Sequence, residues 1–186
     1  MDFIAAAHAS SSSANTLSPA VPTGTQENDI MFALAKLQQS GTPVPPATPS
    51  GWTLLADTNE VVSGSNWALF YRIAGASEPG DYAFTWTGLA NNRCKAGIYT
   101  FRDGFDTADP IDVVSDTGYT VNDTALRAAS MSVAVADSPL IFIGGCHSSS
   151  SKTHTPATNP ATFVEHVDDY DSSGRAAFHV ASVIWA

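Results

Sequence analysis

Two histidines, His147 and His154, enclose the most polar stretch of the chain, which is rich in serine. Imidazole nitrogens are common zinc ligands, but a zinc site needs three or four ligands, and serine hydroxyls are poor ones. A third ligand is not evident beside this pair. We therefore interpret the stretch as an exposed loop and predict no metal site there.

Three carboxylates, Asp168, Asp169 and Asp171, fall within four residues. Calcium takes several oxygen ligands from a turning loop, so this cluster could hold the ion. It lacks the spaced acidic pattern and the glycine of the helix-loop-helix calcium site. A solvated acidic hairpin tip before Ser172 is the main expectation, and calcium binding stays open as the alternative.

The sequence contains no motif typical of an active site. A G-x-S-x-G nucleophile elbow, a phosphate-binding P-loop and a dinucleotide fingerprint are all absent. Glycoside hydrolysis needs two carboxylates close together in the fold. The glutamates of this chain are isolated in the sequence, so such a pair would form only if the fold brought two of them together: Glu27, Glu60, Glu78 and Glu165. We expect no catalytic residues, no cofactor and no enzyme activity.

Aromatic residues could instead form stacking platforms for sugars. Four tryptophans lie in or beside strand-like segments, where core packing is the better expectation: Trp52, Trp67, Trp86 and Trp185. Tyr119 and Tyr170 lie in predicted loops and are the better candidates for stacking on a ligand.

The elements that must position these residues are strands. In the segment 81–87, Tyr82, Phe84 and Trp86 share one face, because successive side chains of a strand alternate between faces. Similar short segments separated by turn residues follow along the chain. The predicted strands are 2–10, 16–21, 29–37, 52–57, 66–73, 81–87, 95–101, 111–114, 126–136, 140–145, 162–167 and 175–185. This pattern predicts an all-β protein, an antiparallel β-sandwich of jelly-roll-like order, with an immunoglobulin-like sandwich as the alternative.

We expect residues 1–186 to form one domain. Ile30–Leu37 contains good helix formers, but flanking loop residues favour a buried strand. The segments 95–101 and 175–185 are apolar on both faces. We therefore expect both faces of each segment to be covered, one by the second sheet and the other by a loop or another subunit. Residues 1–21 are expected to form an extended N-terminal arm, and the Pro-rich stretch 42–50 a surface loop.

Composition narrows the classes of partner. Only 14% of residues are charged, the net charge is −10, and the eight basic residues are scattered, which argues against nucleic-acid binding. Cys94 and Cys146 lie in apolar segments, where a buried free thiol is the main expectation. The sequence shows no signal peptide and no membrane span, so we expect synthesis in a reducing cytoplasm.

The order of several segments resembles the β-sandwich modules of virion proteins from tailed bacteriophages, which include capsid decoration (cement) proteins, head fibres and tail-associated proteins. The segments that carry the resemblance are Asn28–Ala35, Pro49–Leu55, Trp67–Ala74, Gly80–Trp86 and Gly97–Arg102. They cover roughly residues 25 to 105. The resemblance brings no catalytic residue with it.

The resemblance implies a structural virion protein, a decoration protein that stabilises the phage head through subunit contacts. Proteins of this kind commonly form homotrimers that bind the major capsid protein. The alternative is a receptor- or carbohydrate-binding module of a tail fibre or cell-surface protein. In that case Tyr119, Tyr170 and the loop from His147 to His154 would form a binding rim.

Overall fold

The chain folds into antiparallel strands, as the alternating sequence patterns predict. The structure is a computed structural model, and it describes residues 1–38, 44–60, 65–87, 93–115, 132, 138–147, 163–172 and 176–184. None of these residues is helical, and nothing in these ranges could therefore cross a bilayer as a helix. The strands are β1 (Asp2–Ser11), β2 (Thr16–Leu17), β3 (Ile30–Gln38), β4 (Thr53–Glu60), β5 (Ser65–Ile73), β6 (Phe84–Thr85), β7 (Arg93–Arg102), β8 (Pro139–His147), β9 (Val164–Asp171) and β10 (Ala176–Ile184).

Five strands form a central antiparallel sheet in the order β1-β7-β3-β5-β4. Strands β3 and β7 pair along their full length, from Ile30 opposite Phe101 to Gln38 opposite Arg93. The prediction that Ile30–Leu37 is a strand is confirmed. Its side chains are buried on both faces of the sheet, which explains why the segment has no polar stripe.

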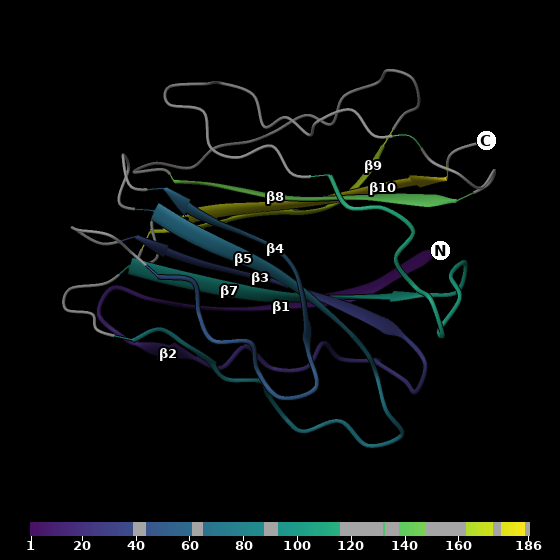
Figure 1. Ribbon diagram of the computed structural model, residues 1–186, viewed down its shortest axis with the longest axis horizontal. Coiled ribbons are helices and arrows are strands. Elements are labelled where there is room, and N and C mark those ends of the chain that lie inside the picture. Colours follow the sequence, from purple (N-terminus) through teal and green to yellow (C-terminus); the bar gives the residue numbers. More distant parts are fainter. Residues whose placement is uncertain are drawn as a thin grey trace.

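A three-stranded antiparallel sheet, in the order β8-β10-β9, covers one face of the central sheet (Figure 1). Phe32 of β3, Phe101 of β7 and Phe178 of β10 meet in the core between them. Each fully buried side chain of this size contributes roughly 1.5–3 kcal/mol to folding. The two packed sheets confirm the predicted antiparallel β-sandwich, a class that includes jelly-roll and immunoglobulin-like arrangements.

The opposite face of the central sheet is covered by a thin layer that contains β2 and β6 (Figure 1). Tyr82, Phe84 and Trp86 point into this second core, and the residues between them are exposed, as the sequence alternation predicted. The ring of Trp52 packs edge-on against Tyr82 and Phe84, with centroids 5.2 and 5.9 Å apart. Strand β7 lies between two layers, which confirms the prediction that both of its faces are covered.

Residues 1–21, for which we expected an extended arm, lie within the fold instead. Asp2–Ser11 pairs with β7 as the outermost strand of the central sheet, and Thr16–Leu17 pairs with β6. Ala6 packs against the core between the sheets, and Ala9 against the core on the opposite face. The small alternating side chains of this segment fit an edge strand, and pairing satisfies backbone groups that an arm would leave to water.

The described part of the Pro-rich stretch, residues 44–50, runs beside β6. The Ala47 N–H donates to the Thr85 carbonyl oxygen at 3.2 Å. Val44 is exposed, whereas Pro46 is buried. This part of the stretch is therefore a surface segment with one side packed, and residues 42 and 43 lie outside the described ranges.

Several predicted strands change in length or do not form. The segments 16–21 and 81–87 contribute only the two-residue β2 and β6, because Pro19 has no N–H to extend the ladder. The predicted strand 111–114 is absent, and Val113 and Val114 are exposed. The predicted strand 126–136 falls outside the described residues except at position 132.

Cys94 confirms the prediction of a buried free thiol. Its side chain is fully buried in the core beneath β2 and β6. Burial raises the pKa of this thiol to about 11, so it stays protonated and packs as a small apolar group. The side chain of Cys146 lies outside the described part of the structure.

Candidate functional site

A charged cluster occupies the interior between the central sheet and the three-stranded sheet. Lys95 of β7 is 1% exposed, and its Nζ lies 2.7 Å from Oδ2 of Asp169 on β9. The Asp169 side chain is 37% exposed, so the pair runs from the interior to the edge of the sandwich. A lysine ammonium in this position loses its hydration and must be compensated by the protein.

Backbone groups of the three-stranded sheet complete the surroundings of the Lys95 ammonium. Nζ donates to the carbonyl oxygens of Asp169 at 3.0 Å and of Ala176 at 3.4 Å. It also lies 5.0 Å from the centroid of the Phe178 ring, whose face attracts a cation. Lys95 is therefore held in place by β9 and β10, although it belongs to the other sheet.

His8 of β1 contacts the same carboxylate, with Nδ1 3.2 Å from Asp169 Oδ2. Burial lowers the pKa of His8 below its ordinary 6.5, and nearby Lys95 lowers it further, whereas the Asp169 carboxylate opposes the shift. The ring meets Tyr99 in an edge-to-face contact with centroids 5.5 Å apart. A neutral imidazole that can carry a proton thus stands beside the Lys95–Asp169 pair.

Tyr99 and Gly97 show how tightly this cluster is fitted. The Tyr99 hydroxyl is fully buried, and within the described ranges it has no hydrogen-bond partner. Burial raises the pKa of Tyr99 well above 10, and the charge of Asp169 adds to the effect, so the phenol stays protonated. A Cβ atom at Gly97 would stand 2.5 Å from His8 Cδ2 and 2.6 Å from the Tyr99 hydroxyl oxygen, so only glycine leaves room for both rings.

Asp168 and Asp169, two of the three clustered aspartates, contact different partners. Their strand, β9, continues through Asp171, so they do not form the predicted hairpin tip. Asp169 faces Lys95, whereas Oδ1 of Asp168 lies 3.0 Å from Nδ1 of the buried His179 on β10. Within the described ranges no group of three or more His, Cys, Asp or Glu side chains could hold a metal ion. This divergence follows from strand alternation and gives the calcium alternative no support.

A second polar pair lies at the edge of the sandwich where β1 begins. Glu165 pairs with Ala181 and Val167 with Val180, so His166 is the extra residue of a β-bulge in β9. A bulge places neighbouring side chains on the same face, and His166 accordingly points inward, where its Nε2 lies 2.7 Å from Ser182 Oγ. Burial lowers the pKa of His166, which keeps the imidazole neutral near pH 7.

This pair belongs to a groove of about 450 Å³ at the mouth of the space between the sheets. The ring of Phe3 stacks on His166 with centroids 4.6 Å apart. The lining residues, mostly apolar, are Met1, Asp2, Phe3, Pro139, Val164, His166, Ser182 and Val183. Such a groove offers apolar walls with one hydrogen-bonding pair, a combination that suits a small ligand or an apolar side chain of a partner.

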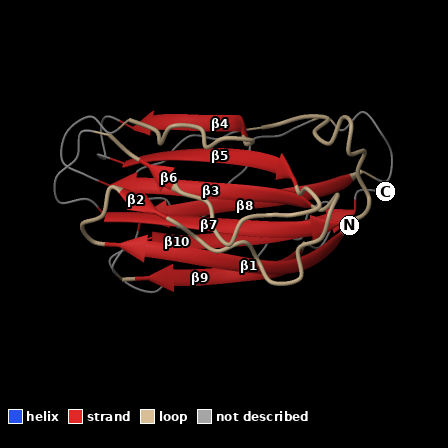
Figure 2. Cartoon of the chain, turned by 90° about the horizontal axis from the view of Figure 1, so that it is seen from below, coloured by secondary structure: helices blue, strands red, loops and turns tan. Residues whose placement is uncertain are grey.

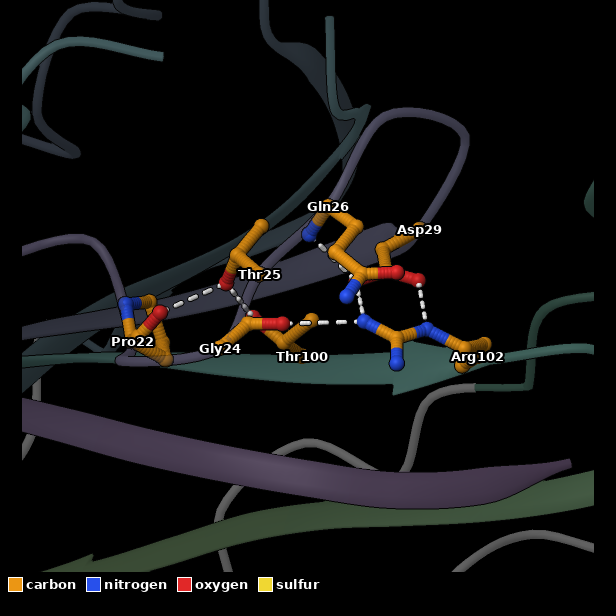
Figure 3. Close-up of polar contacts among 7 residues, drawn as sticks. All are labelled: Pro22, Gly24, Thr25, Gln26, Asp29, Thr100 and Arg102. Carbon is orange, nitrogen blue, oxygen red and sulfur yellow. Dashed lines mark hydrogen bonds and ion pairs between the residues drawn. The ribbon is translucent and has the colours of Figure 1, made fainter. Parts of the chain in front are cut away.

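Two other acidic residues, the buried Asp29 and the partly buried Glu78, serve the fold. Asp29 is 2% exposed and accepts from Arg102 through both carboxylate oxygens, at 2.7 Å to Nε and 2.8 Å to Nη2 (Figure 3). The same carboxylate accepts from the Gln26 N–H, and Arg102 also donates to the Gly24 carbonyl oxygen. These contacts fix the loop that precedes β3 against the end of β7 (Figure 3).

Glu78 has the same kind of role. Burial alone would raise the pKa of its carboxyl, but hydrogen bonds from the Tyr82 hydroxyl, the Gly75 N–H and Arg72 lower it overall. Glu27 and Glu165 are exposed, and the side chain of Glu60 lies outside the described part. The predicted glutamates are therefore not brought together as an acid pair in the part of the chain described here.

The tryptophans and tyrosines singled out in the sequence can be compared with the structure where their side chains are described. Trp52 and Trp86 are buried, which confirms the prediction that they belong to the core, and Trp67 packs against the core between the sheets. Tyr170 is half-buried on β9 rather than in a loop. Tyr119, His154 and Trp185 lie outside the described residues, as does the side chain of His147.

Sequence analysis missed the residues of the inter-sheet cluster, His8, Lys95 and Tyr99. One signal was present: Lys95 is the charged residue within an apolar segment predicted to be covered on both faces. A lysine there must find an internal partner. Which acidic residue supplies it depends on how the two sheets stack, and strand patterns do not contain that information.

Comparisons with protein-family models, curated proteins and solved structures found no match to this chain.

Proposed function

We propose that this protein is a structural component of a virion, of the capsid decoration type, that acts by packing its β-sandwich against copies of itself and against the major capsid protein. The resemblance of residues 25 to 105 to phage virion modules supports this proposal. It involves no catalytic turnover. The structural observation that carries it is the outer edge of β1.

Strand β1 has an irregularity in its pairing with β7 between Phe3 and Ala5, but otherwise carries few of the features that normally protect an edge strand from pairing. It is ten residues long and rich in alanine. Its only acidic residue is Asp2 at its start, and its only basic residue is His8, which faces inward to Asp169. Natural proteins usually block such edges with lysine, proline, bulges or short length. Within the described ranges no strand pairs with the outer side of β1 (Figure 2).

Other edges of the sandwich carry such protection. Strand β9 lies on the same side as β1 (Figure 2) but contains Glu165 and three aspartates as well as the bulge at His166. Strand β4, at the opposite edge of the central sheet, contains Asp57 and Glu60, and its bulge between Leu54 and Ala56 is comparable with the irregularity in β1. The lower charge of β1 supports it as the edge that a neighbouring subunit covers, and its small side chains allow that subunit to approach closely.

The mechanism we propose is additive. A strand-edge contact is modest when taken singly, but a symmetric trimer repeats it, and a capsid repeats the trimer. The summed contacts raise the force needed to separate capsomers. The contact between Lys95 and Asp169, which joins the two sheets, keeps the subunit rigid under that load.

A second candidate function, recognition of a receptor or carbohydrate, is favoured by the groove beside Phe3, His166 and Ser182. Two measurements separate the two functions, one on virions and one on the purified protein. Immunogold electron microscopy of virions made by the virus that carries the gene should label the head surface, and a glycan array should show no binding. Unlabelled virions together with specific glycan signals would overturn the decoration role and support the binding module.

A further inference from the structure

We propose that Lys95 and Asp169 condense to form an amide, an intramolecular isopeptide bond that cross-links the central sheet to the three-stranded sheet. The reacting groups are already in contact, since Lys95 Nζ lies 2.7 Å from Asp169 Oδ2. Asp169 Cγ, the carbon to be attacked, is one bond further. The inference concerns the isolated subunit and does not rest on the proposed function.

The geometry supplies proximity that free amines and acids lack. Nζ is fixed from two directions by the carbonyl oxygens of Asp169 and Ala176, at 3.0 and 3.4 Å. Intramolecular groups that reach a near-attack geometry react as if at effective concentrations on the order of 10⁵–10⁸ M, and this contact places Nζ close to such a geometry. Water has little access to the Lys95 side of the pair, which is 1% exposed, whereas Asp169 is 37% exposed and offers a path by which the released water can leave.

Burial also favours the product over the ion pair. The buried Lys95 ammonium carries a desolvation cost that the partly exposed Asp169 carboxylate largely escapes, and the amide removes this cost by replacing both charges with one neutral group. The Phe178 ring, 5.0 Å from Nζ, makes the surroundings less polar still. Because one positive and one negative charge disappear together, the net charge of the protein does not change.

The chain contains a group that can move the required protons. A proton passes from the Lys95 ammonium to Asp169 Oδ2, which gives a neutral amine and a carboxylic acid. The amine lone pair attacks Cγ, the bond from Cγ to the hydroxyl oxygen breaks, and the proton that the nitrogen must lose passes through His8 Nδ1, 3.2 Å from Oδ2, to the leaving oxygen, which departs as water. One amide and one water molecule form, and no oxidant, metal or cofactor is consumed.

Intact-mass spectrometry of the purified, denatured protein tests the proposal. The wild-type chain should be lighter than its sequence by the mass of one water molecule, and a protease digest should contain one branched peptide that joins Lys95 to Asp169. Lys95→Met and Asp169→Ala should have their full sequence masses. Asp169→Asn should lose ammonia in place of water. A wild-type chain at its full sequence mass would overturn the proposal, whatever the variants do.

The role of His8 is tested separately. His8→Ala keeps both reacting side chains, so cross-linking should be incomplete or absent, whereas the matched control His166→Ala should be fully cross-linked. Circular dichroism of both variants establishes that the sheets are intact. Complete cross-linking in folded His8→Ala would show that the pair reacts without the imidazole and would remove His8 from the proposed step.

Discussion

At the scale of single residues, Gly97 is the most sensitive position of the inter-sheet cluster. An added Cβ would collide with His8 and Tyr99 at 2.5 and 2.6 Å, and neither ring can move far inside a packed core. We predict that Gly97→Ala lowers the free energy of unfolding by about 1–3 kcal/mol, the usual cost of overpacking. Urea denaturation followed by fluorescence measures this change.

Gly80→Ala is the matched control, because a Cβ at Gly80 would meet no atom within 4 Å. Its stability should equal or slightly exceed that of the wild type, since alanine restricts the unfolded chain. Equal stability of Gly97→Ala and the wild type would mean that the two rings are not packed as closely as described.

Burial of single residues could be predicted from the sequence, whereas their contact partners could not. The burial of Trp52, Trp86 and Cys94 could be predicted, because apolar residues in a strand pattern lie on the face that packs into the core. The partnership of Lys95 with Asp169 could not, because it depends on which strand of the second sheet lies above β7. His8 gave no sequence signal, since its role comes from the position of β1 next to β7.

At the scale of elements, the long strands could be predicted from the sequence. Their residues either alternate between apolar and polar or are apolar throughout, and both patterns are typical of strands. The bulge at His166 could not, because one extra residue in a ladder becomes visible only once the register with β10 is known. The same limit explains the N-terminal segment. A run of alanine and serine reads equally as an arm or as an edge strand until its neighbour β7 is placed.

The proposed role of the β1 edge leads to a prediction at this scale. Ala7→Lys places a charge on β1, which is a common natural device against strand pairing. We expect the proposed trimer to be lost while the subunit remains folded, as measured by size-exclusion chromatography and circular dichroism. Val113→Lys, at an exposed loop position, is the control and should remain trimeric. A stable trimer of Ala7→Lys would exclude the outer edge of β1 as the contact.

At the scale of the whole molecule, stability should depend on pH through the buried histidines. The pKa values of His8 and His166 are both lowered from 6.5 by burial, so the folded state favours neutral imidazoles. Their contribution is present above pH 6.5, and it is lost as the pH falls through the folded-state values, because the unfolded chain binds protons first. The thermal midpoint should therefore fall as the pH is lowered below 6.5.

His166→Gln, which keeps a hydrogen-bonding group for Ser182, should show a shallower fall over this range. The comparison is made by thermal denaturation of both proteins in the same series of buffers. Parallel curves for the variant and the wild type would show that His166 does not contribute to the acid sensitivity.

The central claim is that this sandwich is a building block that associates with copies of itself. Light scattering of the purified protein at low and high concentration tests it most directly. We predict the mass of a trimer of the 19.4 kDa chain at both concentrations. A mass of one chain at both concentrations would contradict the claim and would leave the groove beside His166 as the main functional surface.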